Sequence, residues 1–146
     1  MSKSYVQGVY KPVNSSKYTG KYPIIFRSSW EFKAMQLFDT NPNFISWTSE
    51  SLKIPYMNPF TGKYTVYVPD FVVTYIDSKG NQKAEIIEIK PMKETFLEHA
   101  KSQQAKAAVV LNMFKWNAAR AFAKQHGLEF RIMNENHIFN NPVRKK

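Results

Sequence analysis

The stretch YVPDFVVTYIDSKGNQKAEIIEIKP (residues 67–91) decides the fold, because it reads as two strands joined by a polar turn. β-Branched and aromatic residues favour a strand on each side of the turn. Yet Asp70, Glu88 and Lys90 interrupt runs that otherwise predict burial. Because side chains alternate along a strand, we expect Asp70 to lie in a row of valines, and Glu88 and Lys90 to share one face of the next strand.

Charged side chains in these apolar rows need a counter-charge or a hydrogen-bond partner that offsets the cost of burial. An unpaired carboxylate among apolar side chains costs several kcal/mol, and two neighbouring carboxylates also repel each other. A divalent cation relieves both costs, and Mg²⁺ typically takes one or two carboxylates together with substrate phosphate. This interpretation predicts metal-dependent phosphodiester hydrolysis, with a lysine that orients water or stabilises charge. The residues alone leave a second interpretation open, an ion pair between Asp70 and Lys90 on an edge hairpin.

A helix is expected over residues 27–42, capped by Ser28 or Ser29 and ended by Asn41-Pro42. On a helical wheel its apolar arc contains Trp30, Ala34, Met35, Leu37 and Phe38, whereas Lys33, Gln36 and Asp39 lie elsewhere. Glu31 falls inside the apolar arc, where an acid needs a specific reason.

The remaining elements complete a mixed α/β order. We expect strands over 44–56, 64–76 and 82–91 in a meander, with a turn over 57–63. A helical region over 95–126 follows, with Asn112 as a candidate break and Gly127 as its C-cap, and a last strand over 128–135. A helical crossover then places this late strand in the sheet.

Composition narrows the function. The chain has 146 residues, so we expect one domain, and with 43% hydrophobic residues it can build a core. Twenty-one Lys and Arg against 11 acids give a net charge of +10, which favours nucleic acid over lipid or an acidic protein as the partner. The absence of cysteine excludes disulfides and thiolate metal sites, and no apolar run predicts a membrane span or a signal peptide, so a cytosolic location is expected.

Both ends of the chain are basic. The first 23 residues interleave four lysines with four tyrosines, a pattern that suits phosphate contact and base stacking and equally suits an arm packed on the domain through its tyrosines: Lys3, Tyr5, Tyr10, Lys11, Lys17, Tyr18, Lys21, Tyr22. A short basic tail over about 140–146 is expected to fray.

At this point the residues resemble a known family. VPDF (68–71) and EIK (88–90), with seventeen residues between Asp70 and Glu88, resemble the PD-(D/E)xK nuclease motif, and SSWE (28–31) resembles the helical glutamate of that superfamily. The ordered set over most of the chain is similar to TnsA-type transposon endonucleases. It is closer still to head-completion nucleases of large tailed phages, with which it shares an arm of the form SYxQGxYxP (4–12).

The resemblance implies a restriction-endonuclease-like fold and a catalytic set of Glu31, Asp70, Glu88 and Lys90. It assigns Asp70 and Glu88 as direct ligands of Mg²⁺, for which Mn²⁺ substitutes, with the carbonyl of Ile89 and, through water, Glu31 completing the shell. It also implies a nuclease acting on packaged DNA at head–tail joining in the host cytoplasm. Portal or neck proteins are expected partners and retention in the virion is a further expectation. The alternatives are an endonuclease of recombination, transposition or defence, and a non-catalytic DNA-binding virion assembly protein.

Other candidates have simpler interpretations. Glu50 is either a surface strand residue or a supporting residue of the site, and Arg27 and Ser28 precede Glu31 where they could contact phosphate. A helix after the motif carries polar residues that suit a DNA groove or a solvated face: Lys93, Gln103, Gln104, Lys106. The histidines show no metal-ligand spacing, and two tryptophans are expected in the core: His99, His126, His137, Trp47, Trp116.

Overall fold

The computed structural model describes residues 7–91, 100–134 and 137. Within them the elements follow in the order β1 (Gly8–Tyr10), η1 (Ser15–Lys17), β2 (Ile24–Phe26), α1 (Ser29–Thr40), β3 (Phe44–Ser49), β4 (Ile54–Met57), β5 (Tyr64–Tyr67), β6 (Phe71–Ile76), β7 (Gln82–Ile89), α2 (Gln103–Gln125) and β8 (Glu129–Met133).

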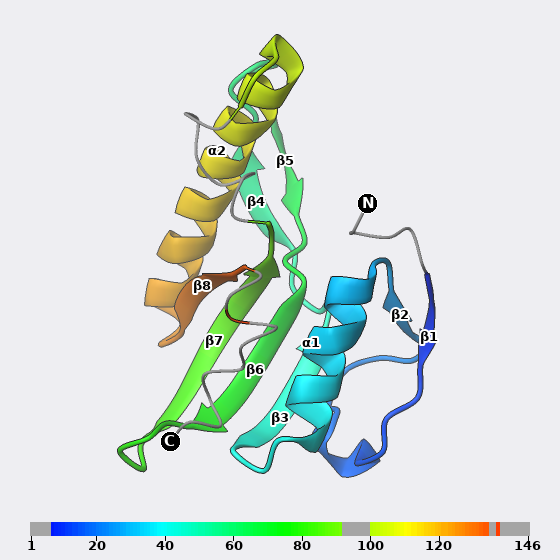
Figure 1. The fold of residues 1–146 in the computed structure, drawn as a ribbon. Helices are drawn as coiled ribbons and strands as arrows, with labels where there is room; N and C mark the ends of the chain where they lie inside the picture. Colours follow the sequence, from blue (N-terminus) through cyan, green and yellow to red (C-terminus); the bar gives the residue numbers. More distant parts are fainter. Residues whose placement is uncertain (1–6, 92–99, 135–136, 138–146) are drawn as a thin grey trace.

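The central sheet has the strand order β3-β6-β7-β8, in which β8 runs parallel to β7 and the other pairs are antiparallel. The two long helices cover opposite faces of this sheet (Figure 1). Phe71 and Ile87 face α1, whereas Val72 and Ile86 belong to the apolar cluster under α2. The predicted α/β fold with a restriction-endonuclease-like mixed sheet is therefore confirmed.

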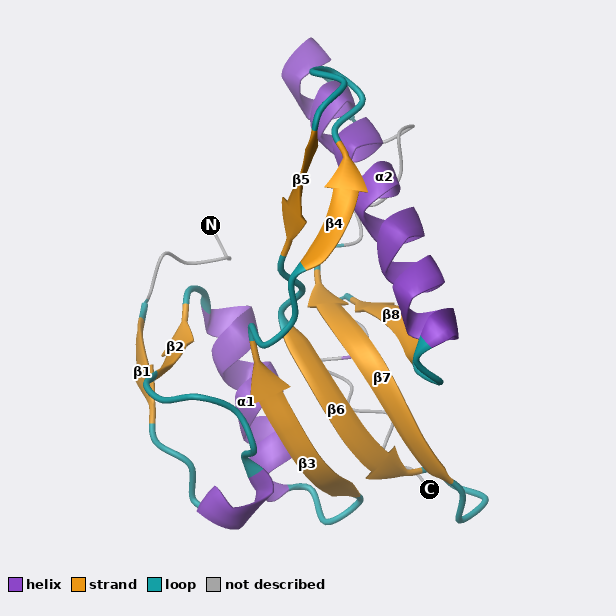
Figure 2. Ribbon diagram, turned by 180° about the vertical axis from the view of Figure 1, so that it is seen from behind, coloured by secondary structure: helices purple, strands orange, loops and turns teal. Residues whose placement is uncertain are grey.

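Two of the predicted strands are each divided in the structure. The strand expected over 44–56 separates into β3 and β4, and the one expected over 64–76 separates into β5 and β6. Glu50 has a φ of +51° at the first break, and Pro69, which has no N–H to donate, lies at the second. As a result β4 and β5 form a separate ribbon, which extends beyond the central sheet and packs on α2 (Figure 2).

The long helix α2 is continuous through Asn112, so the candidate break there was wrong. Asn costs well under ~1 kcal/mol relative to Ala in a helix, and the strong helix formers around it outweigh that cost. Residues 95–99 of the expected helical region lie outside the described residues. Gly127 follows the helix with a φ of +72°, and Leu128 N donates to Ala123 O at 2.8 Å, as expected of a glycine C-cap.

The N-terminal arm is described from residue 7 and packs on the domain. Tyr10 and Tyr18 are buried, and each packs edge-on against Trp47. The packing interpretation therefore holds for these two tyrosines, while Lys11, Lys21 and Tyr22 are exposed. Lys3 and Tyr5, like the expected basic tail, lie outside the described residues.

Asp39 anchors this arm. The helical wheel placed Asp39 off the apolar arc, whereas the structure buries it. The side chain is fully buried and accepts hydrogen bonds from Tyr10 Oη (2.6 Å), Val13 N (2.8 Å) and Asn14 N (2.9 Å). Burial alone would raise the pKa of Asp39, but these donors and the charge of Lys17 outweigh it and hold the pKa below its ordinary value. The wheel missed Asp39 because its donors come from a distant segment of the chain.

Candidate active site

Asp70 lies in the break between β5 and β6, where its side chain and its backbone carbonyl each accept a hydrogen bond. Its Oδ2 accepts a hydrogen bond from Ile89 N at 2.8 Å, so the amide of the last residue of β7 has an acceptor beyond the start of β6. Its backbone carbonyl accepts from Glu50 N at 2.9 Å. The break therefore lets the Asp70 side chain turn toward the end of β7 instead of continuing a ladder.

Glu88 lies on β7, on the face that Ile86 presents to α2. The residue is 9% exposed, and its Oε1 accepts a hydrogen bond from Tyr67 Oη at 2.6 Å. Tyr67 itself is buried on β5, three residues before Asp70. The ribbon thus fixes the orientation of the Glu88 carboxylate.

The two acids share one electrostatic environment. Burial raises the pKa of Asp70 well above its ordinary value, and the charges of Glu88 and Glu31 raise it further, against the opposing effects of the Ile89 N–H and Lys90. Burial also raises the pKa of Glu88, against Tyr67, Lys90 and Lys115. The fold therefore buries Asp70 and Glu88 near one end of the sheet, where the charge of Lys90 acts on both, at a free-energy cost that a cation would relieve.

Glu31 approaches from the first turn of α1 and has a local role as well. Ser28 Oγ accepts from Glu31 N at 3.2 Å, which confirms Ser28 as the N-cap, and Glu31 Oε1 accepts from Arg27 N at 2.9 Å. This reciprocal arrangement resembles a capping box displaced by one residue. Capping therefore accounts for part of the reason an acid stands at this position, while the charge of Glu31 still acts on Asp70.

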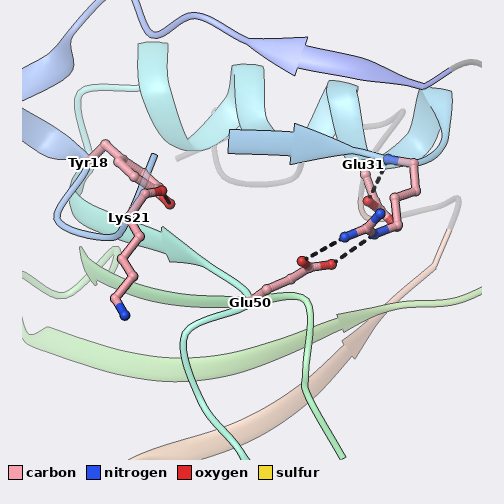
Figure 3. Close-up of polar contacts among 5 residues, drawn as sticks. Tyr18, Lys21, Glu31 and Glu50 are labelled. Carbon is pink, nitrogen blue, oxygen red and sulfur yellow. Dashed lines mark hydrogen bonds and ion pairs between the residues drawn. The ribbon is translucent and has the colours of Figure 1, made fainter. Parts of the chain in front are cut away.

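Arg27 and Glu50 form an ion pair at the edge of this group (Figure 3). Arg27 Nε and Nη2 lie 3.1 and 3.0 Å from the two carboxylate oxygens of Glu50, a two-point contact. Glu50 is exposed just after the end of β3, and its backbone N–H connects it to the carbonyl of Asp70.

Comparison with known proteins identifies the family. The model of the TnsA-like endonuclease N-terminal domain matches residues 41–135. The chain belongs to the TnsA-like endonuclease family. A relative described as "Head completion nuclease", from Enterobacteria phage T4, is 36% identical over 139 residues, covering 88% of this chain and 90% of the relative. The resemblance seen in the sequence is therefore confirmed, and the chain is a DNA nuclease by family.

The donor set of this TnsA-like domain fits a hard divalent cation bound through few protein ligands. Within residues 7–91, 100–134 and 137, no group of three His, Cys, Asp or Glu side chains lies close enough to hold a metal ion. Asp70 and Glu88 nevertheless supply two carboxylates, and Mg²⁺ commonly takes only one or two and keeps several waters. Because the N–H and C=O of a strand residue point the same way, the Ile89 carbonyl faces the side on which its N–H meets Asp70.

Two residues of the site had escaped the sequence argument, Tyr67 and Lys115. Lys115 Nζ lies 6.0 Å from the ring centroid of Tyr56 and 5.8 Å from that of Tyr67, and its charge lowers the pKa of Glu88. Tyr67 stands in the quoted stretch, but alternation does not reveal that its hydroxyl reaches Glu88. Lys115 gave no signal, because its position depends on how α2 packs on the ribbon.

The other candidates lie away from these acids or outside the described residues. Gln103, Gln104 and Lys106 are exposed on α2, as a solvated face requires. His126 is exposed and stacks on Phe122, and both predicted core tryptophans are buried: Trp47, Trp116. Lys93 and His99 fall outside the described residues. No helix among the described residues is both long and apolar enough to cross a membrane.

Proposed function

We propose that the protein is a Mg²⁺-dependent deoxyribonuclease that hydrolyses phosphodiester bonds at the end of β7. The observation that carries this proposal is that Asp70, just before β6, accepts a hydrogen bond from Ile89 N, between Glu88 and Lys90 at the end of β7, in a chain of an endonuclease family. Asp70, Glu88 and the Ile89 carbonyl would hold the cation directly, and Glu31 would act through water. The bound cation would neutralise the carboxylates and stabilise charge that develops on the scissile phosphate. Mn²⁺ is expected to substitute.

The protein residues then have distinct tasks. Tyr67 orients the Glu88 carboxylate, and the Ile89 N–H orients that of Asp70. Lys90 directs its amine at the attacking water or at the phosphate oxygens, where a positive charge is most effective. Water then attacks phosphorus and gives up a proton to solvent, and the sugar oxygen takes up a proton from solvent as its bond to phosphorus breaks.

We also propose that the chain acts as one nuclease domain in completing phage heads, by trimming packaged DNA in the host cytoplasm before tails attach. The similarity to the phage T4 relative over most of both chains supports this role. Head, portal or neck proteins would be its protein partners, and retention in the virion would follow from binding them. Service in recombination, transposition or defence is the alternative role for the same chemistry.

Replacing Lys90 with alanine tests catalysis directly. We expect the variant to bind DNA but to cleave plasmid in Mg²⁺ about 10²–10⁴-fold more slowly, the range that a positioned acid or base contributes. Gel assays with Mg²⁺ and with EDTA measure cleavage, and fluorescence anisotropy in EDTA measures binding. Unchanged cutting by the variant would refute the role of Lys90. Binding without cutting by the wild-type protein would favour the non-catalytic DNA-binding assembly protein.

The net charge of +10 leads to a separate expectation about salt. Lysine and arginine that contact phosphates release counterions, so we expect DNA affinity to fall about 10³–10⁵-fold between ~50 and ~200 mM salt if six to ten phosphates are contacted. Anisotropy titrations at several salt concentrations give the slope. A flat response would contradict phosphate contact as the role of the basic surface.

A further inference from the structure

The ion pair between Arg27 and Glu50 is a two-point contact, which fixes the direction of the guanidinium more closely than a single-atom salt bridge would. The Arg27 side chain is 52% exposed, yet Nε and Nη2 both engage Glu50, at 3.1 and 3.0 Å. A guanidinium has five N–H donors, of which this contact uses two. The outer edge, formed by Nη1 and the second hydrogen of Nη2, engages no described residue in a hydrogen bond.

That outer edge has the chemistry of a phosphate site. Two parallel N–H groups on a planar cation match two oxygens of a phosphodiester, and arginine provides this geometry better than lysine. Glu50 occupies only the inner edge, so it orients the guanidinium without consuming the donors that a phosphate needs. Half-exposure leaves Arg27 accessible to a duplex.

The pair is tied to the acids of the proposed active site by backbone contacts. Arg27 N donates to Glu31 Oε1 at 2.9 Å, and Glu50 N donates to the carbonyl of Asp70 at 2.9 Å. Hydrogen bonding and charge from Glu50 raise the pKa of Arg27, and Glu31 and Asp70 raise it further. Arg27 therefore lies within electrostatic reach of Asp70, on the α1 side of the sheet.

The backbone of Glu50 also indicates a specific role. Its φ of +51° lies in the left-handed region, which non-glycine residues seldom adopt and which concentrates at functional sites. This conformation turns the chain out of β3 and lets Glu50 meet both the Asp70 carbonyl and Arg27 (Figure 3 shows the side-chain contact).

We propose that Arg27 binds a phosphate group of the DNA beside the carboxylates, and that Glu50 is the positioning residue that aims its guanidinium. The inference rests on the proposed nuclease function for its setting but concerns a contact that can be measured without cleavage. It predicts that Arg27 affects both binding and rate, whereas Glu50 affects mainly rate.

The experiment compares Arg27→Ala, Glu50→Gln and the double variant with the wild-type protein. Binding to a short duplex is measured by anisotropy in EDTA at several salt concentrations, and cleavage is measured in Mg²⁺. We expect Arg27→Ala to weaken binding about tenfold and to lower the salt slope by about 1, the value for one lost phosphate contact. We expect Glu50→Gln to lower kcat about tenfold while DNA affinity changes less than about threefold, because misaimed groups lose rate without losing charge.

The double variant and a matched control separate this role from a structural one. If Glu50 acts through Arg27, Glu50→Gln adds no further loss of rate when Arg27 is already alanine. Lys79→Ala removes one exposed positive charge in the turn between β6 and β7, at the far end of β6 from Asp70, and should leave slope and rate unchanged. Thermal unfolding shows that each variant is folded.

The outcomes decide between the two proposals. A folded Arg27→Ala that keeps the wild-type affinity and salt slope would overturn the phosphate contact. Glu50→Gln that lowers affinity and rate equally, or that still slows the Arg27→Ala protein, would overturn the positioning role. A wild-type protein that binds but never cuts would overturn the nuclease proposal, and the binding measurements would still decide the contact made by Arg27.

Discussion

Replacing Asp70 with asparagine is expected to eliminate Mg²⁺-dependent cleavage and, at the same time, to stabilise the metal-free protein. Loss of a direct ligand removes several kcal/mol of transition-state stabilisation, so we expect the rate to fall roughly a thousandfold or more. Stability should move the other way, because burial and the charges of Glu88 and Glu31 disfavour the ionised carboxyl that asparagine replaces.

The pH dependence of this stabilisation has a definite sign. The folded pKa of Asp70 is raised, so its contribution to stability is complete below its ordinary value of 3.8 and is lost as the pH rises through the folded value. The advantage of Asp70→Asn over the wild-type protein should therefore grow as the pH rises. Denaturant unfolding in EDTA at a series of pH values measures it.

The stabilisation of the folded protein by Mg²⁺ completes the test. A cation that binds only the folded protein adds about 2.7 kcal/mol of stability at a concentration 100 times its Kd. We expect this increment for the wild-type protein and none for Asp70→Asn. Asp77→Asn, which changes a partly exposed carboxylate in the turn after β6 and keeps an oxygen for the amides of Lys79 and Asn81, should keep both the increment and cleavage. Equal stabilisation of Asp70→Asn by Mg²⁺ would show that the cation binds elsewhere.

Replacing Asp39 with alanine is expected to cost about 3–5 kcal/mol of unfolding free energy, because it leaves one buried and two partly buried donors without an acceptor, at about 1–3 kcal/mol each. The donors are the hydroxyl of Tyr10 and the amides of Val13 and Asn14, and all three belong to the N-terminal arm. The expected result is a destabilised protein whose arm is released. Urea unfolding followed by tryptophan fluorescence measures it, since Trp47 packs against the same arm.

Two further variants show how much of the stability lost in Asp39→Ala comes from individual hydrogen bonds. Tyr10→Phe removes one donor and should cost only about 1 kcal/mol, the net value of one hydrogen bond. Asp39→Asn should cost less than alanine but more than Tyr10→Phe, because its oxygen keeps one set of donors while its NH₂ group faces the other. The pKa of Asp39 is lowered, so its stabilisation is present above the ordinary value of 3.8 and is lost as the pH falls through the folded value. A loss below about 1 kcal/mol in Asp39→Ala would show that the arm does not depend on this carboxylate.

Periodicity located most elements because its cause is local. Alternating apolar residues gave the positions of β6, β7 and β8, and capping residues gave the ends of α1 and the C-terminal end of α2, whereas α2 begins at Gln103 and not near residue 95. The same approach did not predict that the strands divide at Glu50 and at Pro69. A φ of +51° at a glutamate has no signature in composition, because contacts from Asp70 and Arg27 hold it.

The sequence by itself predicted that Asp70 on one strand and Glu88 and Lys90 on the next lie near each other, since alternation and spacing are properties of the extended chain. It also determined the family, through an ordered set of motifs. Only the tertiary structure decided how Tyr67 and Lys115 surround Glu88, how Arg27 and Glu50 reach the acids, and that Asp39 is buried. These depend on contacts between segments far apart in the chain, and a local pattern carries no information about which distant donor will meet a given carboxylate.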